Sequence, residues 1–593
     1  MVHAVLQRLR QLANTPNGAA ALSFLLPGLG QAAAGKRSRG AIVAIPALTL
    51  LGVIILLVLV DRHSIMDAAF NQQWLTSLLL IDVVALIYHV WAVLDSYRLA
   101  GRVEPEPRRK GPAPRKSGVA LGVALVLAGT VLVHGGFASF VMGWQGDLNC
   151  VTSLTGECMF PDATLAPGQT IAMATDDPNV DVQVDPSGSP DGSSPAPTDT
   201  SPAGPSLDPN ATFDPASLPS FSSPPNAENW AADGQLNVLL AGIDAGSGGA
   251  RNSGLRPDTM IVLHVDLKTG RAAMIGIPRN TQCVPLPQAI AAHYARNSNG
   301  CPGYTYPNML NWFANEAGWN HPSWFPFYQG ASLAYTRAMT ATQEAIETLT
   351  GLTIDGYAVI NLEGLVTIID DVGGIDITVP SNLTAYDGPC GAKGTWAAKI
   401  RVCGLNPPHS GYPIASPSVI PHMIADAAKS GGKQKITWQG NGGYDIGFSV
   451  AAGAQHMDGD WALAYARTRI YTTDYNRMMR QQLVLKAMRQ TLNPCALLPQ
   501  VGKLMGDAGT AFWTNLPIAD SVTQWAGLAQ AITGTDVKSI TLDPATLGNP
   551  RTTYINATTW ARAKDIVAHS LDNVPAASGG GSGGSGGAGG FHC

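Results

Sequence analysis

The stretch 464–485 reads AYARTRIYTTDYNRMMRQQLVL and is unusually rich in arginine. Its four arginines are Arg467, Arg469, Arg477 and Arg480. The second half of the stretch predicts a helix that begins near Thr473 or Asp474, because both residue types favour helix N-termini. The helix would follow a short polar turn and carry its basic residues in its first turns.

One face of this predicted helix begins with a charged residue and continues with apolar residues. Arg477, Gln481, Val484 and Met488 follow the spacing i, i+4, i+7, i+11 and therefore share that face. An inward-facing guanidinium is costly unless an anion meets it. Two anions stay open at this point: a carboxylate in a salt bridge, or phosphate oxygens, which a guanidinium fork binds in pairs.

Strands and helices alternate on both sides of this stretch. Apolar and alternating runs predict strands over 236–243, 259–265 and 272–277, the last two forming a hairpin around Lys268, Thr269 and Gly270. The further predicted elements are helices over 331–349 and 362–371, strands over 354–361, 375–379 and 538–542, and helices near 499–506 and 521–533. This alternation predicts an α/β fold, an α/β/α sandwich built on a mixed sheet.

The composition of the chain is uneven and divides its 593 residues into segments. The predicted segments are a cytoplasmic or interfacial region (1–40), three transmembrane helices (41–144), a Pro/Ser-rich linker (145–234), a catalytic domain (235–555) with an irregular insertion (384–448), and a C-terminal segment (556–593) with a Gly/Ser-rich tail. The sandwich is therefore expected to be an outer domain behind a helical membrane region.

Three runs, over 41–60, 75–94 and 119–141, have the length of about 20 apolar residues that crosses a bilayer. Asp82 and His89 fall within the second run, where ionisable residues are expected to face protein rather than lipid. Basic residues cluster before the first run and between the second and third, whereas the loop between the first and second holds only Arg62. Positive loops stay inside, so we expect a multi-pass cell-membrane protein with a cytoplasmic N-terminus and an extracellular catalytic domain.

All eight cysteines follow the third run, as expected for an oxidising exterior. The local pairings that we expect are Cys150 with Cys158, Cys283 with Cys301, and Cys390 with Cys403, while Cys593 could be free or bridged to Cys495. Neither a CxxC pair nor an HExxH motif occurs, which argues against a zinc site. The net charge of −5 argues against nucleic acid as a partner.

Two aspartates, Asp244 and Asp258, leave neighbouring predicted strands. Aspartate is common at strand ends because it bonds its own backbone, and that explanation stays open for both. The functional alternative is a magnesium site, since Mg²⁺ usually takes one or two carboxylates together with phosphates and water. Arg279 leaves the hairpin at the same expected edge of the sheet. Converging cations around a metal are the arrangement that phosphoryl transfer requires; the expected set is Arg256, Arg279, Arg467, Arg469 and Arg477.

Five stretches together carry a resemblance to a known family. They are NVLLAGID (237–244), RPDTM (256–260), IPRNT (277–281), the segment 357–380 with VGGID (372–376), and 464–485. Their order and spacing resemble the LytR-CpsA-Psr family of membrane-anchored cell-envelope enzymes. The resemblance covers about residues 235–490 and continues to about 550.

The resemblance implies Mg²⁺-dependent transfer of a glycopolymer phosphate from a polyprenyl pyrophosphate carrier to peptidoglycan, with Mn²⁺ as a possible substitute for Mg²⁺. The carrier lipid would lie in an apolar tunnel between the sheet and the helices. The catalytic residues that it implies are Asp244, Asp258 and Arg279, with both aspartates as metal ligands. The substrate-binding residues that it implies are Arg256, Arg467, Arg469, Arg477, Gln481 and Asn311.

The chain also departs from the family pattern. Asn280 stands where the family has an aspartate after Pro-Arg, Pro257 replaces a small polar residue, and three membrane runs replace one. Two other functions stay open on the same residues. Water could replace the acceptor sugar, which would make the protein a polyprenyl pyrophosphate hydrolase. The domain could also be a non-catalytic anchor or regulator that binds lipid phosphate or glycan.

Overall fold

The computed structural model describes residues 15–60, 67–101, 116–153, 156, 158–159, 216, 218–219, 233–243, 255–296, 298–325, 328, 330–384, 434–438, 444–467, 474–491, 507–509, 511–518, 537–549 and 554–575. The chain divides into two compact units. The first comprises Met1–Leu148 with Ile518–Trp525, and the second comprises Asn149–Pro517 with Ala526–Cys593.

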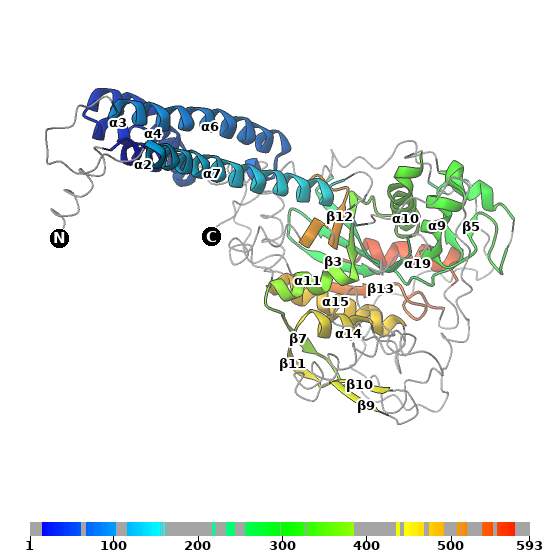
Figure 1. Cartoon of the computed structure of the whole chain (residues 1–593). Coiled ribbons are helices and arrows are strands. Elements are labelled where there is room, and N and C mark those ends of the chain that lie inside the picture. Colours follow the sequence, from blue (N-terminus) through cyan, green and yellow to red (C-terminus); the bar gives the residue numbers. More distant parts are fainter. Residues whose placement is uncertain are drawn as a thin grey trace. The chain divides into compact units, whose positions relative to one another are not determined.

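The first unit is helical (Figure 1). Its described helices are α2 (Pro16–Leu25), α3 (Leu29–Ala33), α4 (Arg37–Val60), α6 (Gln72–Ala100) and α7 (Lys116–Val151), the last of which runs on into the second unit. Three stretches are long and apolar enough to cross a membrane: Arg37–Leu57, Gln72–Ala100 and Leu121–Val151. They coincide with the three runs predicted from the sequence. Helix α7 continues to Val151, beyond Val141, where the predicted third span ends.

The short helices α2 and α3 form a hairpin against α6. The hydroxyl of Ser96 donates to the carbonyl of Ala19, and the side-chain amide of Gln31 donates to the carbonyl of Ala92 at 2.9 Å. Gly30 allows this close approach, because a Cβ at that position would lie 2.1 Å from the carbonyl oxygen of Ala19. The glycines of this segment therefore pack a helical hairpin tightly against a spanning helix.

The second unit is built on a six-stranded mixed sheet, as predicted. Its strands, in spatial order, are β12 (Phe512–Thr514), β6 (Gly356–Asn361), β1 (Gln235–Ile243), β2 (Pro257–Asp266), β3 (Ala272–Gly276) and β13 (Val537–Thr541). Strand β1 runs parallel to β6 and antiparallel to β2, and β3 runs parallel to β13. The predicted strands and hairpin at 236–277 thus lie at the centre of the sheet, where apolar side chains can be buried on both faces.

Helices cover both faces of this sheet (Figure 1). Along β1, alternate side chains point to the same face of the sheet. Those of Leu239, Ala241 and Ile243 therefore enter the larger hydrophobic core together. That core is completed by α9 (Leu310–Asn315), α10 (Ala334–Thr350) and α19 (Ala557–Ala568). The second core contains α11 (Leu362–Asp371), α14 (Gly459–Arg467) and α15 (Asp474–Thr491), with Ile360 of β6 packed against it. This arrangement is the α/β/α sandwich.

Three features differ from the sequence predictions or extend them. The insertion 384–448 was predicted to be irregular, but its described part holds β9 (Gln434–Trp438) and β10 (Tyr444–Val450), an antiparallel pair with β8 (Leu383–Thr384) beside it. Helix α19 lies beyond the predicted end of the catalytic domain and packs Trp560, Ala563 and Val567 into the larger core. Met159 and Leu218, within the predicted linker, belong to the same core.

Two of the predicted disulfides are present, Cys150–Cys158 and Cys283–Cys301. Near the first, the indole nitrogen of Trp513 donates to the carbonyl of Ser153, so this segment is fastened to β12. The predicted Cys390–Cys403 pair lies outside the described residues, and so do Cys495 and Cys593. The predicted helices near 499–506 and 521–533 also lie outside them.

Candidate active site

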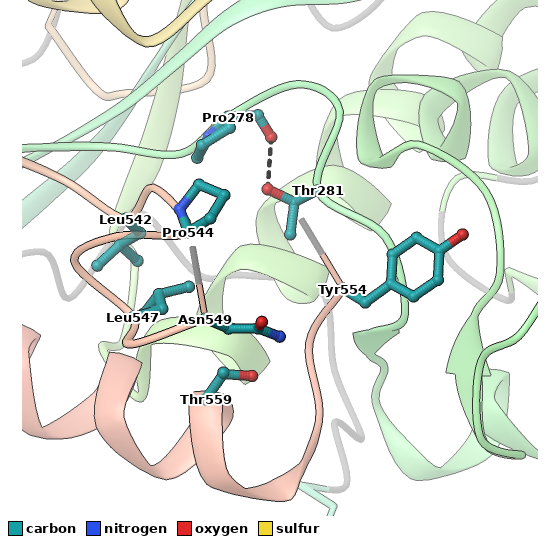
Figure 2. Close-up of a pocket in the computed structure, with 8 residues that line it drawn as sticks. All are labelled: Pro278, Thr281, Leu542, Pro544, Leu547, Asn549, Tyr554 and Thr559. Atoms are coloured by element: carbon teal, nitrogen blue, oxygen red, sulfur yellow. Dashed lines mark hydrogen bonds between the residues drawn. The ribbon is translucent and has the colours of Figure 1, made fainter. Parts of the chain in front are cut away.

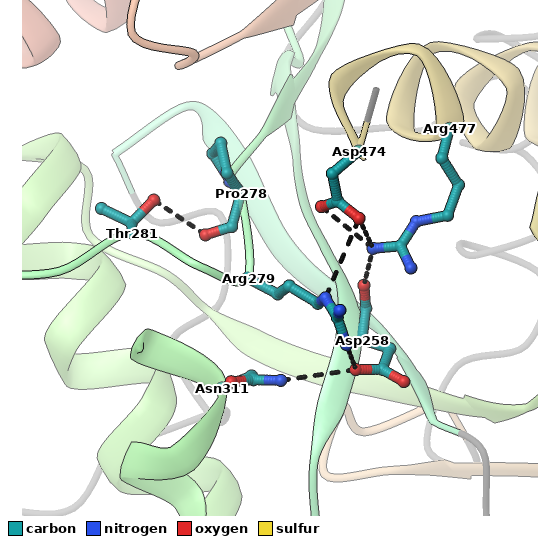
Figure 3. Close-up of polar contacts among 7 residues, drawn as sticks. All are labelled: Asp258, Pro278, Arg279, Thr281, Asn311, Asp474 and Arg477. Carbon is teal, nitrogen blue, oxygen red and sulfur yellow. Dashed lines mark hydrogen bonds and ion pairs between the residues drawn. The ribbon is translucent and has the colours of Figure 1, made fainter. Parts of the chain in front are cut away.

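The register of the central hairpin brings Arg279 to Asp258. Gly276 of β3 pairs with Ile261 of β2, and the next residue, Ile277, donates its backbone N–H to the carbonyl of Met260. Two further residues along each antiparallel segment bring Arg279 opposite Asp258. The Arg279 guanidinium donates to Asp258 Oδ1 at 2.9 Å (Figure 3). Asp258 and Arg279 therefore lie at the same sheet edge, as the sequence predicted, and they form an ion pair there.

The loop after β3 also positions Asn311. The backbone N–H groups of Leu310 and Asn311 donate to the carbonyls of Thr281 and Arg279, which docks the start of α9 onto this loop. The side-chain amide of Asn311 then reaches Asp258 Oδ1 at 3.4 Å (Figure 3). Asn311 Oδ1 is buried and has no hydrogen-bond partner among the described residues. Asn311 thus joins the site, as the family resemblance implied.

Helix α15 contributes the second arginine. Its first turns lie over the end of β3, where Gly276 leaves room for Met478 and Gln482. The Arg477 guanidinium donates to the backbone carbonyl of Asp258 at 3.1 Å and pairs with Asp474 at 2.9 Å. Of the two anions that the sequence left open for Arg477, the structure shows the carboxylate, that of Asp474, and the phosphate stays a prediction.

Asp474 is a site residue that the sequence analysis treated only as a helix N-terminus. Its carboxylate pairs with Arg477 and lies 3.8 Å from the Arg279 guanidinium, so it links the two arginines (Figure 3). The i, i+3 spacing to Arg477 was the available signal. Asn280 replaces the family's aspartate, and its buried Oδ1 has no hydrogen-bond partner among the described residues. Here Asp258 and Asp474 are the carboxylates that accompany Arg279.

Arg256 completes the cationic surroundings of Asp258. Its guanidinium lies 4.3 Å from the centre of the Trp312 ring, on α9 beside Asn311. Such stacking fixes a guanidinium plane while its edges stay able to bind an anion. Gln481, one turn beyond Arg477, is buried, and its Oε1 has no hydrogen-bond partner in the part of the chain that the structure describes.

The electrostatics keep Asp258 ionised. Burial would raise its pKa, but the charges of Arg279, Arg477 and Arg256, together with the hydrogen bond from Arg279, outweigh burial and hold the pKa below its ordinary value. The Asp258 side chain remains 30% exposed, and its Oδ2 has no hydrogen-bond partner among the described residues. Counted over the described residues alone, three guanidinium groups and two carboxylates thus leave an excess of one positive charge beside the open carboxylate oxygen.

Arg480 belongs to the arginine stretch but serves the scaffold. It donates to the backbone carbonyl of Tyr465 at 2.8 Å, and its guanidinium lies 5.8 Å from the centre of that residue's ring. Burial lowers its pKa to about 10, with the charge of Arg477 adding to the effect, so it stays charged at neutral pH. Its contacts join α15 to α14.

Three predicted site residues cannot be placed in this cluster. Asp244 and Arg469 lie outside the described residues, and Arg467 is the last residue of α14, with its side chain outside the description. No group of three or more His, Cys, Asp or Glu side chains gathers around a possible metal position within the described residues. Asp258 can offer one carboxylate oxygen, which suits an ion such as Mg²⁺ that binds one or two carboxylates and takes its other ligands from phosphate and water.

A small pocket lies beside the same loop. Pro278 and Thr281 line it together with residues of the segment between β13 and α19 (Figure 2). That segment contributes Leu542, Pro544, Leu547, Asn549 and Tyr554, and α19 contributes Thr559. The Thr281 hydroxyl donates to the carbonyl of Pro278, which closes the turn that presents Arg279. The apolar tunnel that the resemblance implies stays a prediction.

Sequence comparisons find two relatives whose names refer to peptidoglycan or to cell wall biosynthesis. The chain is 22% identical over 355 residues to a Bacillus subtilis protein named polyisoprenyl-teichoic acid–peptidoglycan teichoic acid transferase TagV, covering 58% of this chain and 67% of TagV. It is 23% identical over 290 residues to the probable cell wall biosynthesis protein LcpB of Corynebacterium glutamicum, covering 46% of this chain and 47% of LcpB. The match therefore spans about half the length of LcpB.

The crystal structure of Bacillus subtilis TagV is 20% identical in sequence, with a TM-score of 0.33, and the match covers 57% of this chain and 98% of that one. The family model LytR_cpsA_psr matches residues 212–569, a range that includes α19 and the whole described site. The chain belongs to the LytR-CpsA-Psr family.

Proposed function

We propose that this protein transfers a glycopolymer phosphate from a polyprenyl pyrophosphate carrier to peptidoglycan. The observation that carries the proposal is the Arg279–Asp258–Arg477–Asp474 cluster, in which buried guanidinium groups surround a partly exposed carboxylate. The name of TagV describes transfer of teichoic acid from a polyisoprenyl form to peptidoglycan. Family membership makes the same class of reaction the first candidate for this chain.

The arginines are suited to hold a diphosphate. A guanidinium carries five N–H donors and can bind a carboxylate and a phosphate oxygen together. Asp258 and Asp474 fix Arg279 and Arg477 before any substrate arrives, so little reorganisation is needed when charge develops on the leaving phosphate. Arg256, whose guanidinium is stacked on Trp312 of α9, supplies a third positive charge. Positioning and charge neutralisation are the main requirements of phosphoryl transfer.

Asp258 is better suited to bind a cation than to accept a proton. Its pKa lies below the ordinary value, so its carboxylate is a weak base at neutral pH. Asp258 Oδ2, with Asp244 as the predicted second carboxylate, would hold Mg²⁺ or Mn²⁺. The ion would supply charge neutralisation at the phosphates when bound. The proton of the attacking sugar hydroxyl then falls to Asp244 as the candidate base.

The chemistry also fits the proposed location. An enzyme outside the cell has no supply of ATP, so a lipid-linked pyrophosphate would bring its own leaving group. The disulfides Cys150–Cys158 and Cys283–Cys301 are typical of an oxidising exterior. We therefore place the sandwich outside a cell membrane that the N-terminal helices cross several times.

The test uses the full chain in lipid nanodiscs, Mg²⁺ and a polyprenyl pyrophosphate oligosaccharide with a labelled sugar. We expect label to appear on added peptidoglycan, and we expect chelation of the divalent cation to abolish the transfer. Release of labelled sugar phosphate regardless of acceptor would make the protein a hydrolase instead. Binding of the lipid with neither product would make it a non-catalytic anchor or regulator, and either result would overturn the proposal.

A further inference from the structure

A line of three ionisable side chains lies inside the apolar helical unit, away from the candidate active site. His134 of α7 contacts Asp82 Oδ1 through its Nδ1 at 2.7 Å. Its other ring nitrogen, Nε2, lies 3.2 Å from Nδ1 of His89 on α6. His89 Nε2 in turn faces the backbone carbonyls of Ser23 and Phe24, at 3.2 and 3.0 Å. The sequence pointed to Asp82 and His89 but not to their partner.

Helix geometry explains why His134 joins the other two. Asp82 and His89 are seven residues apart on α6, so they share one face and are separated by two turns, roughly 10 Å. The imidazole of His134 enters from α7 and spans that distance with its two nitrogens. At the far end, the carbonyls of Ser23 and Phe24 belong to the last turn of α2, where helix carbonyls lack partners within the helix. The line therefore joins three helices.

The contacts in this line determine how many protons it holds. A carbonyl can only accept, so His89 Nε2 must carry a proton. Asp82 Oδ1 and His134 Nδ1 need one proton between them, and His134 Nε2 and His89 Nδ1 need another. Three protons satisfy every contact, whereas two leave lone pairs opposed and four place two N–H groups against each other.

Three arrangements of those protons have the same net charge of zero. Asp82 can be neutral beside two neutral imidazoles, or it can be ionised with the positive charge on His134 or on His89. The first step moves the Asp82 proton to His134 Nδ1, and the second moves the His134 Nε2 proton to His89 Nδ1. No oxidant, metal or other reactant is needed. The terminal carbonyls of α2 favour positive charge at the His89 end, and the carboxylate favours it beside Asp82.

We propose that Asp82, His134 and His89 form an intramembrane proton relay. An ionisable residue in a spanning helix is costly, and functional chains of Asp, Glu and His are the usual reason for its presence. The relay holds one shared proton and passes it between the α6–α7 contact and the C-terminus of α2.

An aromatic ring packs against the relay, and the polar side chains near it have partners elsewhere. The ring of Phe24 stacks on that of His89, with centroids 6.0 Å apart. Tyr88, next to His89 on α6, directs its hydroxyl to the carbonyl of Val43 on α4. Farther along α6, Asp95 is paired with Arg39 at 2.7 Å. Among the described residues, Asp82 has no basic partner other than His134.

The test uses the full chain in lipid nanodiscs with ¹⁵N in the histidine rings, and His89→Gln and His134→Gln assign the resonances. In the unsubstituted protein we expect both rings to keep averaged, intermediate ¹⁵N shifts from about pH 5 to 8, where an isolated histidine changes its charge. Two rings that titrate independently, each like an isolated histidine, would overturn the proposal. The pH series itself is recorded on the unsubstituted protein, and the two substitutions serve only to assign its resonances.

Asp82→Asn provides the second readout. It removes the acid, so we expect the His89 resonances to move to those of a neutral ring protonated on Nε2, although His89 does not contact Asp82. Asp82→Glu should restore the averaged shifts. The matched control, Tyr88→Phe, removes a hydrogen bond from the same turn of α6 and should leave both rings unchanged. A purely structural line would confine the Asp82→Asn change to His134, and that result would also overturn the proposal.

Discussion

Arg477 and Arg337 are both buried arginines of the second unit, and their surroundings differ completely. Arg337, on α10, donates to four backbone carbonyls, those of Ala317, Gly318, Tyr328 and Gly330. Arg477 pairs with the carboxylate of Asp474 and lies beside the Asp258–Arg279 pair. The first arginine fastens the π-helix Glu316–Asn320 and the segment with Tyr328 and Gly330 to α10. The second belongs to a dense cluster of charges that includes a partly exposed carboxylate.

This contrast shows that burial alone does not mark an arginine as functional. The side chains of both are almost wholly enclosed, with Arg337 3% exposed and Arg477 6% exposed. The four carbonyls accept hydrogen bonds from the Arg337 guanidinium, so this arginine does not depend on a ligand as its partner. Carboxylate partners hold Arg477 near two further cations, and a phosphate can use that excess charge. The type of hydrogen-bond partner, rather than the degree of burial, therefore distinguishes the structural Arg337 from the site residue Arg477.

The largest effect on activity is expected from Arg477→Ala. It removes one cation fixed beside the proposed diphosphate position, and we expect transfer to slow by about 10² to 10³, the loss typical of a charge-stabilising donor. Initial rates of glycopolymer transfer by the full chain measure this. Arg296→Ala, an exposed arginine outside the site, is the matched control and should leave the rate unchanged.

Arg337→Ala should show the opposite pattern. Four carbonyls lose their charged donor, so we expect the second unit to lose on the order of 3 kcal/mol of stability. Thermal unfolding of the full chain in detergent would show a fall in the apparent Tm, while transfer per folded molecule stays near normal. Arg337→Lys should rescue little, because an ammonium group cannot reach carbonyls arranged around a planar fork. An unchanged Tm in Arg337→Ala would remove the contrast with Arg477.

The pH dependence of stability tests whether Arg279 controls the charge of Asp258. Because the pKa of Asp258 is lowered in the folded protein, its ionised form contributes stability above the unfolded pKa of about 3.9, and that contribution is lost only as the pH falls through the lower folded value. We expect no change in the apparent Tm from this group between about pH 5 and 8.

Arg279→Gln tests the same linkage. Arg279 is the first of the cations that lower the pKa of Asp258, so its removal should let that pKa rise. The loss of stability that Asp258 causes on acidification should then be smaller, and it should be complete at a higher pH than in the unsubstituted chain. Apparent Tm values measured from neutral to acidic pH, side by side with Arg296→Ala, detect the shift. Coinciding curves would show that Arg279 does not control the charge of Asp258.

The smallest effect is expected from Asn311→Ala. The contact from its amide to Asp258 is long, at 3.4 Å, and involves a neutral donor. A hydrogen bond of this kind contributes about 0.5–1.5 kcal/mol, so transfer should slow by about tenfold or less. A loss as large as that of Arg477→Ala would mean that Asn311 contacts the substrate directly and does not act only through Asp258.

Much of the fold was predictable because its central strands are strongly patterned. The runs at 236–243 and 272–277 are apolar enough to be buried on both faces, and Leu362–Asp371 and Ile375–Val379 were predicted with their observed bounds. The buried face of α15, from Arg477 to Met488, followed from helical spacing alone. Local periodicity sufficed in these places because each element buries one well-defined face.

The parts that were missed depend on contacts between distant segments. The link from Asp474 to Arg279 exists only because α15 lies over the end of β3. His134 was not singled out, since its partners Asp82 and His89 are on another helix. Helix α19 follows a long irregular segment, and its Trp560 finds its hydrogen-bond acceptor, the carbonyl of Thr348, on α10. The β9–β10 pair had a readable alternation that the glycines around it obscured.

The most direct test of the central claim is equilibrium binding of a polyprenyl pyrophosphate to the full chain in nanodiscs, followed by ³¹P NMR in the presence of Mg²⁺. We predict that Arg477→Ala weakens binding by about 10- to 100-fold, the loss of a charged hydrogen bond, while Arg296→Ala binds like the unsubstituted chain. Equal affinity in all three proteins would contradict the assignment of the carboxylate-paired arginines as the diphosphate site.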